Sequence, residues 1–308
     1  MINVLFLLLI VTANTAVDVR LIYDSNVFLL SDSQIEDFIQ GKPMGFKTYD
    51  DLIARIGLST KNLSLKEWRI KGRFTTNLYF QNPVKSYGVF DLKVLKYFGR
   101  LYRYGYMEYQ FLPYYLIRPI RKSTGENIFL SFTSQEIEGG FNLNNYRVFF
   151  AWANEDYTKP WDFYDSKIYS FGLETKYKPQ ERLAVYLPRM SLTLGYKILR
   201  SRAPLDTPDI SYNGLGLTLG FEFLKKPAFA LSLAGERRGF TTRIDSLHKG
   251  RRDLIGEVEL SLSFPIGKKA RLSFGYEYKI RDTSLEIEEI SELKDYNRDR
   301  ISIGVRYE

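Results

Sequence analysis

The chain of 308 residues carries 44 Lys and Arg against 36 Asp and Glu, a formal net charge of +8, and 44% of its residues are hydrophobic. This apolar content excludes a mainly disordered chain. Cysteine is absent and the one histidine is His248, which excludes disulfide scaffolds, thiolate metal clusters and cysteine catalysis. Aromatic residues make up 16% of a chain whose mean hydropathy is -0.25, so apolar and polar residues must be interleaved.

Residues 1–16, MINVLFLLLIVTANTA, join an apolar run from Val4 to Val11 with small residues at Ala13 and Ala16. This pattern is typical of a cleaved signal peptide, and a first buried strand is the alternative interpretation. We therefore expect a signal peptide at 1–16 and one exported domain at 17–308. A membrane-spanning helix needs about 20 apolar residues, and the longest uncharged stretch in that domain, Ile210 to Phe221, is shorter.

From Lys47 onward, apolar and polar residues alternate with period 2. Between Trp68 and Phe80, for example, one face is apolar and the other carries Arg69, Lys71 and Arg73. Such alternation, broken by turn signals, predicts half-exposed β-strands. We predict fourteen strands, at 17–29, 47–58, 66–80, 86–96, 99–118, 127–142, 145–157, 166–178, 182–200, 211–224, 228–242, 253–265, 269–282 and 298–308.

One of these segments has an ambiguous face. The tyrosines from Tyr102 to Tyr106 alternate on the same face as Glu108 and Gln110. If the tyrosines face outward, the chain must change face before the two polar residues. We therefore predict a β-bulge near Gly105.

The first long connection contains a helix signal. Ser31 and Gln34 form the pattern of a capping box, and Gly41 supplies a stop, which predicts a short helix from Asp32 to Gln40. Its apolar stripe must be covered, either by the neighbouring loops or, as we expect, by the mouth of a barrel. In the latter case the candidate residues that face inward arginines are Asp32, Glu36 and Asp37.

The connections alternate between long and short, and the strand number is even, so both termini lie at one rim. A soluble β-sandwich also alternates. A membrane barrel is favoured because no strand is fully apolar and because Tyr and Phe gather at the segment ends. The predicted fold class is all-β: a closed antiparallel transmembrane β-barrel of about 14 strands.

In such a barrel the polar face of each strand lines the interior. The lumen-lining candidates are Arg55, Arg69, Lys71, Arg73, Glu222, Glu236, Glu257, Glu259, Arg271, Glu277 and Lys279. They indicate either a polar conduit for charged solutes or a packed network of ion pairs, and fourteen strands allow both. The basic and acidic groups lie on different strands, which would give a transverse field unless neighbouring charges neutralise one another.

An enzyme is the contrasting hypothesis. His248 lies among Lys249, Arg251 and Arg252, and we interpret it as a solvated loop residue, because sequence proximity to Asp245 does not establish a catalytic triad. We predict no catalytic residue, no metal site and no cofactor. No phosphate-binding or zinc motif accompanies the positive charge, so nucleic-acid binding is not expected.

Two short motifs carry a resemblance. Residues 23–28, YDSNVF, resemble the first-strand exit of several porin-like barrel families and of the barrels of surface lipoprotein assembly modifiers. The C-terminal ISIGVRYE resembles the terminal strand that the barrel assembly machinery reads. The mature chain thus resembles Gram-negative outer-membrane β-barrel proteins.

This resemblance implies a pore or transporter for polar or charged solutes in the outer membrane. The alternatives are a non-conducting structural or export-assisting barrel and, less favoured, an outer-membrane enzyme. It also implies contacts with outer-membrane lipid and lipopolysaccharide, and assembly through the C-terminal strand. The oligomeric state is left open.

Overall fold

The structure is a computed structural model that describes residues 15–42, 44–60, 63–122, 124–179, 187–204, 207–223, 227–242, 245, 247–285, 292 and 294–307, without the side chains of residues 100–102. The predicted signal peptide lies outside these residues except for Thr15 and Ala16, so it stays a prediction. Within the described part of the chain, no helix is long and apolar enough to cross a membrane.

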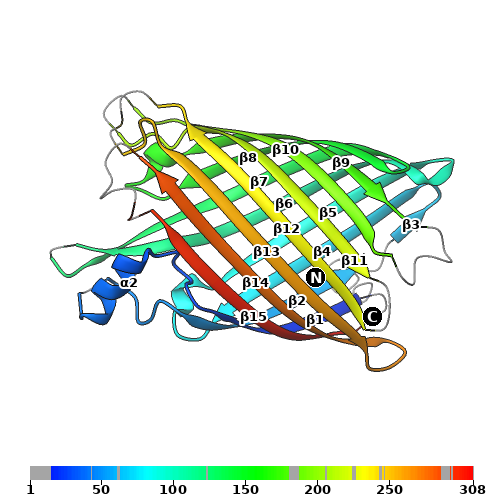
Figure 1. The fold of residues 1–308 in the computed structure, drawn as a ribbon, viewed down its shortest axis with the longest axis horizontal. Helices are drawn as coiled ribbons and strands as arrows, with labels where there is room; N and C mark the ends of the chain where they lie inside the picture. Colours follow the sequence, from blue (N-terminus) through cyan, green and yellow to red (C-terminus); the bar gives the residue numbers. More distant parts are fainter. Residues whose placement is uncertain are drawn as a thin grey trace, which may run out of the picture.

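The strands form one antiparallel sheet that closes on itself (Figure 1). In chain order the elements are β1 (Thr15–Asp24), α2 (Asp32–Ile39), β2 (Asp51–Thr60), β3 (Leu63–Leu65), β4 (Trp68–Tyr79), η1 (Pro83–Lys85), β5 (Tyr87–Phe98), β6 (Arg100–Arg121), β7 (Asn127–Leu143), β8 (Tyr146–Tyr157), η2 (Asp162–Tyr164), β9 (Ser166–Tyr177), β10 (Arg189–Ser201), β11 (Tyr212–Phe223), β12 (Ala228–Phe240), β13 (Arg252–Pro265), β14 (Ala270–Ser284) and β15 (Tyr296–Tyr307).

Closure follows from three pairings that involve the first two long strands. β1 pairs with both β15 and β2, and β2 pairs in turn with β4. The described residues therefore form a closed barrel of fourteen strands, with β3 as a short extra strand beside β4. The predicted fold class and strand number are confirmed. The predicted strand 182–200 begins at Arg189, and its residues 182–186 lie outside the described residues.

The two rims of the barrel differ. Both described ends of the chain, and the tight turn at residues 144–145, lie at one rim. The other rim carries the longer connections, including α2, η1 and η2, and there the β6–β7 hairpin extends beyond its neighbours (Figure 1). This asymmetry is the arrangement expected of an outer-membrane barrel, in which the rim with the longer loops is extracellular. We call it the outer rim.

The two faces of each strand differ as the alternation predicts. On β11, Leu215 and Leu217 are 55% and 46% exposed on the outside, whereas Gly216 and Thr218 line an interior cavity. On β15, Ile301 and Ile303 are likewise exposed. An outer surface of this composition is suited to lipid, because apolar side chains meet acyl chains without cost.

The predicted irregularity near Gly105 is present, but it does not change the face of β6. Where β5 pairs with β6, the register shifts between the Tyr97–Tyr104 and Phe98–Arg100 pairs, next to Gly105. Pairing of β6 with β7 is continuous from Arg103 to Leu112, with further irregularities between Leu112 and Tyr115 and between Leu116 and Arg118. Tyr106 faces the lumen like Glu108, so no change of face is needed. Its hydroxyl donates to Glu138 at 2.6 Å, and its ring lies over Gly140, where a Cβ would collide with it.

The first long connection, residues 25–50, folds into the outer end of the barrel. Its Val27, Phe28 and Leu30 form a buried apolar core with Ile22, Ile53 and Tyr79, which face inward from β1, β2 and β4. The predicted strand at 17–29 therefore ends at Asp24. We call residues 25–50 the inserted loop.

Helix α2 belongs to this inserted loop and has the predicted capping box. The backbone N–H of Gln34 donates to Ser31 Oγ at 3.3 Å, and that of Ser31 donates to Gln34 Oε1 at 3.2 Å. Ile35 packs against the apolar core, and the ring of Phe38 stacks on that of Phe46. Ile35 and Phe38 of the apolar stripe are thus covered at the barrel mouth, whereas Ile39 is exposed.

Candidate functional site in the barrel lumen

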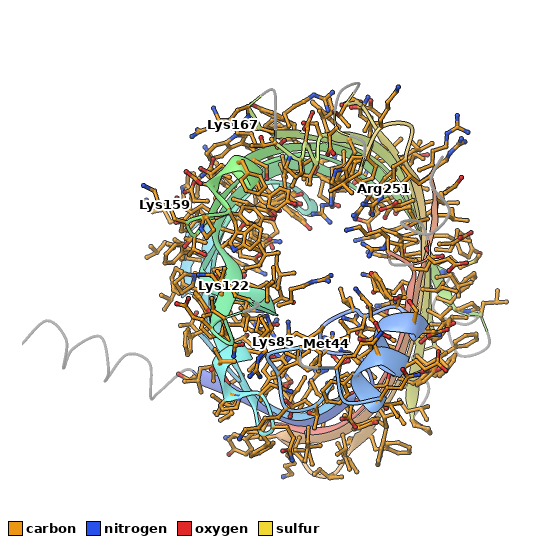
Figure 2. All side chains as sticks on the ribbon, turned by 90° about the vertical axis from the view of Figure 1, so that its left-hand side faces the viewer. Met44, Lys85, Lys122, Lys159, Lys167 and Arg251 are labelled. Atoms are coloured by element: carbon orange, nitrogen blue, oxygen red, sulfur yellow. The ribbon has the colours of Figure 1, made fainter. Side chains whose placement is uncertain are left out.

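The lumen contains two cavities, of about 740 Å³ and about 490 Å³. Gly220 and Glu259 line the larger cavity, and Thr218 and Glu257 line the smaller one. These are successive inward positions on β11 and β13, so the cavities are consecutive sections of one lumen. Figure 2, which looks into the barrel from the outer rim, shows this central space between the side chains.

The lumen has two kinds of wall. From β8 to β12 the inward positions are mostly small; they include Ala151, Ala153, Ser170, Thr193, Gly195, Gly214, Gly216, Thr218, Gly220, Ser232 and Ala234. On β1, β2 and β4 to β6 many of the inward side chains are large, among them Arg55, Lys93 and Tyr106. Space therefore remains mainly along the small-residue wall.

Most of the predicted acidic residues have basic neighbours. Glu236 pairs with Arg238 and Glu257 with Lys279, each at 2.8 Å, while Glu222 lies 3.7 Å from Arg189. Glu277 pairs with Arg298 and lies 3.6 Å from Arg300. Glu259 lines the larger cavity without an ion pair among the described residues. Neighbouring charges thus neutralise most of this acidic side.

The predicted basic residues of β2 and β4 behave differently. Arg55 donates through Nε to the neutral Asn77 at 2.7 Å, and the Arg69 guanidinium lies 4.7 Å from the centre of the Tyr97 ring. Lys71 and Arg73 lie on the same face of β4 as the buried Asn77. None of these four forms an ion pair with a described carboxylate. They give the lumen a wall with uncompensated positive charge.

The remaining candidates lie at the two ends of the barrel. Arg271 is exposed at the start of β14, at the rim that carries the termini. Of the mouth-helix candidates, Asp37 pairs with Lys42 of its own loop at 2.5 Å, and Glu36 is exposed. Asp32 lines a rim cavity of about 470 Å³ together with Arg281.

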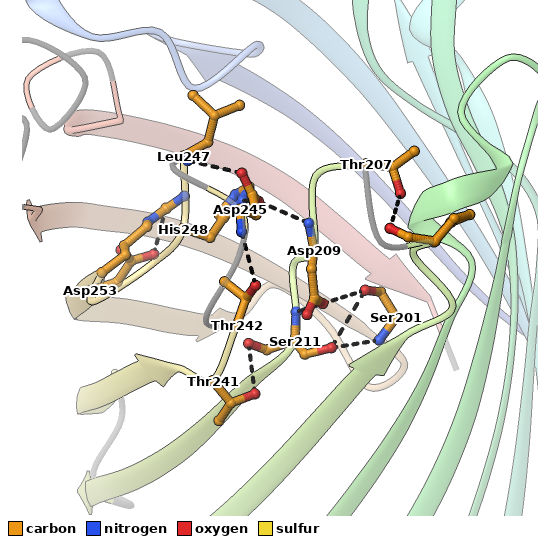
Figure 3. Close-up of polar contacts among 12 residues, drawn as sticks. Ser201, Thr207, Asp209, Ser211, Thr241, Thr242, Asp245, Leu247, His248 and Asp253 are labelled. Carbon is orange, nitrogen blue, oxygen red and sulfur yellow. Dashed lines mark hydrogen bonds and ion pairs between the residues drawn. The ribbon is translucent and has the colours of Figure 1, made fainter.

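The interpretation of His248 as solvated is wrong. His248 is 4% exposed, its Nδ1 contacts the Asp245 carboxylate, and its ring stacks on Phe240 with the ring centres 5.2 Å apart. Asp245 also accepts from the backbone N–H of Asp209 at 2.8 Å, which joins the β10–β11 and β12–β13 connections (Figure 3). Burial lowers the pKa of His248, although Asp245 opposes this shift. His248 thus contacts Asp245, the residue whose bond to Asp209 joins the two loops.

Sequence reasoning missed Lys85, which is 2% exposed in η1. Its ammonium donates to the carbonyl oxygens of Leu116 at 2.8 Å and Ile117 at 3.2 Å, where the pairing of β6 is irregular. It also lies 4.9 Å from the Phe28 ring centre of the inserted loop. The only sequence signal was a lysine in a short connection, and the β6 irregularity that supplies the carbonyls was not predicted at this place.

A closed antiparallel barrel with an apolar outside and a charged, partly open inside defines a transmembrane β-barrel of the bacterial outer-membrane type. Within the described residues, no group of three or more His, Cys, Asp or Glu side chains is placed to hold a metal ion.

No protein-family model and no curated protein matches the chain. Among solved structures, a bacterial polysaccharide outer membrane secretin aligns with a TM-score of 0.50 and 8% identity over 94% of this chain and 97% of that one. The outer membrane channel DcaP of Acinetobacter baumannii aligns at 0.46 and 12% over 96% of each chain. The NanC porin aligns at 0.45 and 9% over 95% of this chain and 99% of that one. At 8% identity, the alignment with the secretin establishes a shared barrel fold and nothing more specific.

Proposed function

We propose that the protein is a passive pore of the bacterial outer membrane that conducts small polar solutes and favours anions. The observation that carries this proposal is the pair of consecutive lumen cavities, of about 740 and 490 Å³. Barrels of about eight strands are filled by side chains, but here Gly, Ala, Ser and Thr on one wall leave the interior partly empty.

The anion preference rests on a difference in pairing: most acidic side chains of the lumen have ion-pair partners, whereas several basic side chains do not. Glu236 and Glu257 are neutralised by basic neighbours, whereas Arg55, Arg69 and Lys71 have no carboxylate partner among the described residues. Uncompensated positive charge in a cleft with low-dielectric walls raises the local concentration of anions.

Single-channel recording in planar bilayers under a KCl gradient tests both parts of the proposal. We expect discrete conductance steps and a reversal potential that indicates preference for chloride. Replacement of Arg55, Arg69 and Lys71 by Gln should move the reversal potential toward zero. Lys167→Gln is the matched control, because Lys167 points away from the lumen in Figure 2.

Silent bilayers despite verified insertion would favour the alternative, a non-conducting structural or export-assisting barrel. Preference for potassium in the unmodified protein would overturn the anion assignment alone. Hydrolysis of lipid or peptide that His248→Ala abolishes would instead support an enzyme.

We also propose that basic side chains at the outer rim contact lipopolysaccharide phosphates and that β15 is the assembly signal. In support, β15 is a regular strand that pairs with both β14 and β1. Truncation of residues 301–308 in cells tests the assembly signal. We expect the truncated protein to be exported but not to fold into the membrane.

A further inference from the structure

A row of aromatic rings lines the lumen near the outer rim. Tyr115, Phe132, Tyr157 and Tyr164 come from β6, β7, β8 and η2, and successive ring centres are 5.5, 5.2 and 5.7 Å apart. Tyr115 and Phe132 are direct cross-strand partners, as are Phe132 and Tyr157. We call these four side chains the ring row.

The ring row faces the interior of the barrel. Tyr157 lies on the same face of β8 as Ala153 and Glu155, and Phe132 lies on the same face of β7 as Glu136. Ala153, Glu155 and Glu136 line the smaller cavity. None of the four residues is fully buried. Rings that served lipid contact would lie on the other face of these strands, as Phe150 does.

Positive groups without carboxylate partners lie beside the ring row. The Lys85 ammonium is 5.1 Å from the centre of the Tyr115 ring, at one end. At the other end, Arg118 pairs with Leu130, two positions from Phe132 on β7. Burial and Asp245 raise the pKa of Tyr164, and the charge of Arg118 lowers it.

A basic loop residue completes this group. The backbone carbonyl of Lys294 accepts from Arg281 Nε at 2.7 Å. Burial and the charges of Arg118, Arg251 and Arg281 together lower the pKa of Lys294 to about 8. Arg251 is paired with Asp253, but Lys294, Arg118 and Arg281 have no ion pair with any described carboxylate. Arg118 lies on β6 and Lys294 on the β14–β15 connection. Cations from well-separated parts of the barrel therefore meet at the outer mouth.

We propose that the ring row, together with Arg118 and Lys294, forms a capture site at the outer mouth for a solute that has both a ring face and a negative charge. Ring faces bind apolar ring surfaces by stacking, and unpaired cations bind a carboxylate or phosphate with charge-assisted hydrogen bonds. Ligand sites commonly combine apolar walls with a few such polar groups. This capture site rests on the pore proposed above and names the class of solute that enters it.

Current block in planar bilayers tests the solute class. Benzoate supplies an aryl ring and a carboxylate, galacturonate supplies a sugar ring and a carboxylate, acetate lacks the ring and benzyl alcohol lacks the charge. We expect saturable block of the chloride current by benzoate, by galacturonate or by both, at concentrations where acetate and benzyl alcohol have little effect. Block by only one of the two acids identifies the ring as aryl or sugar. Equal block by acetate, or by benzyl alcohol, overturns the proposal.

Substitutions locate the block. Phe132→Leu and Tyr157→Leu each remove one ring while keeping an apolar side chain, and each should raise the half-blocking concentration about fivefold. Lys294→Gln should likewise raise the half-blocking concentration of the two acids. The matched control is Phe150→Leu, which removes an outward ring that is 43% exposed. Block that both ring-row variants leave unchanged would overturn the proposal, and if one variant fails to insert, the other decides.

A binding measurement separates this capture site from the pore. The Trp161 ring centre lies 6.5 Å from that of Tyr164, so in a variant with Trp68→Phe and Trp152→Phe its fluorescence reports on the end of the ring row. Saturable quenching by benzoate or galacturonate but not by acetate supports the site even if no current is seen, in which case only the pore is wrong. Conductance without any saturable quenching or block overturns the site and leaves the pore intact.

Discussion

Asp24 and Arg300 are direct partners across the seam where the first and last strands meet, and Arg300 Nε donates to Asp24 Oδ2 at 2.6 Å. The Asp24 side chain is fully buried. Its other oxygen accepts from the backbone N–H of Asn26 at 3.1 Å. One carboxylate therefore ties the barrel seam to the start of the inserted loop.

Removing this carboxylate should be costly. Among the described carboxylates, Asp24→Ala leaves Arg300 with the more distant Glu277 alone, and loss of one partner of a buried pair typically costs about 3 to 5 kcal/mol. The free energy of unfolding in urea, measured in lipid micelles, checks this value. Glu36→Ala, at an exposed position of α2, is the control and should change it little. Equal stability of the two variants would show that the seam pair is not needed.

The assignment of faces is tested by two neighbours on β11. Leu217 points to the lipid and Thr218 to the lumen. An arginine in mid-membrane on the lipid face costs about 2 to 4 kcal/mol, whereas lumen substitutions mainly change selectivity. Leu217→Arg should therefore refold less stably than Thr218→Arg, by equilibrium unfolding in lipid vesicles. The opposite order would mean that the faces are reversed.

The helix of the inserted loop should restrict the mouth. Deletion of residues 32–40 removes α2, including Phe38, which packs on Phe46. We expect larger single-channel conductance and a shift toward anions, because Asp32, Glu36 and Asp37 are lost. Ile39→Ser is the control, since Ile39 is 68% exposed. A deletion variant with unchanged conductance and selectivity would place the helix outside the solute path.

Lys85 should make stability depend on pH. Burial, together with the charges of Arg300, Arg118 and Arg298, lowers its pKa to about 7 against the opposing charge of Asp24. An unfolded lysine titrates near 10.4, so between these values the unfolded chain binds the extra proton. Stability should therefore rise as the pH increases from about 7 to 10.

Unfolding free energies at pH 7 and pH 10 measure this effect. Lys85→Met keeps a long apolar side chain without the titrating group, so the rise attributable to Lys85 should disappear in this variant. Lys167→Met, at an exposed position, should keep it. An identical pH dependence in the Lys85 variant and the unmodified protein would contradict the prediction.

Most of the architecture could be predicted because alternation and turn residues act locally. A strand such as β11 reveals its two faces through Leu217 and Thr218 alone, and Ser31 with Gln34 specifies where α2 begins. The even strand number and the alternating loop lengths then determine the topology. These signals needed no knowledge of distant contacts.

Features that depend on distant partners could not be predicted. Tyr106 has the apolar ring of an outward residue, but Glu138 on the next strand and the absence of a Cβ at Gly140 hold it inside. Lys85 and His248 look like surface residues until the carbonyls of β6 and the ring of Phe240 are placed around them. The lumen candidates were chosen from strand parity, but their ion-pair partners follow only from register.

The small-residue wall of the lumen has a consequence for how this barrel can diversify. An added Cβ at Gly195 or Gly216 would meet only backbone oxygens, no closer than 3.7 Å. The bore can therefore be narrowed from that side by single substitutions that leave the strands undisturbed. The fixed positive charges lie on β2 and β4, away from this side. The width of the lumen and its charge preference are thus set by separate surfaces. A barrel of this design can change the size limit of its solute while keeping the sign of the solute charge that it prefers.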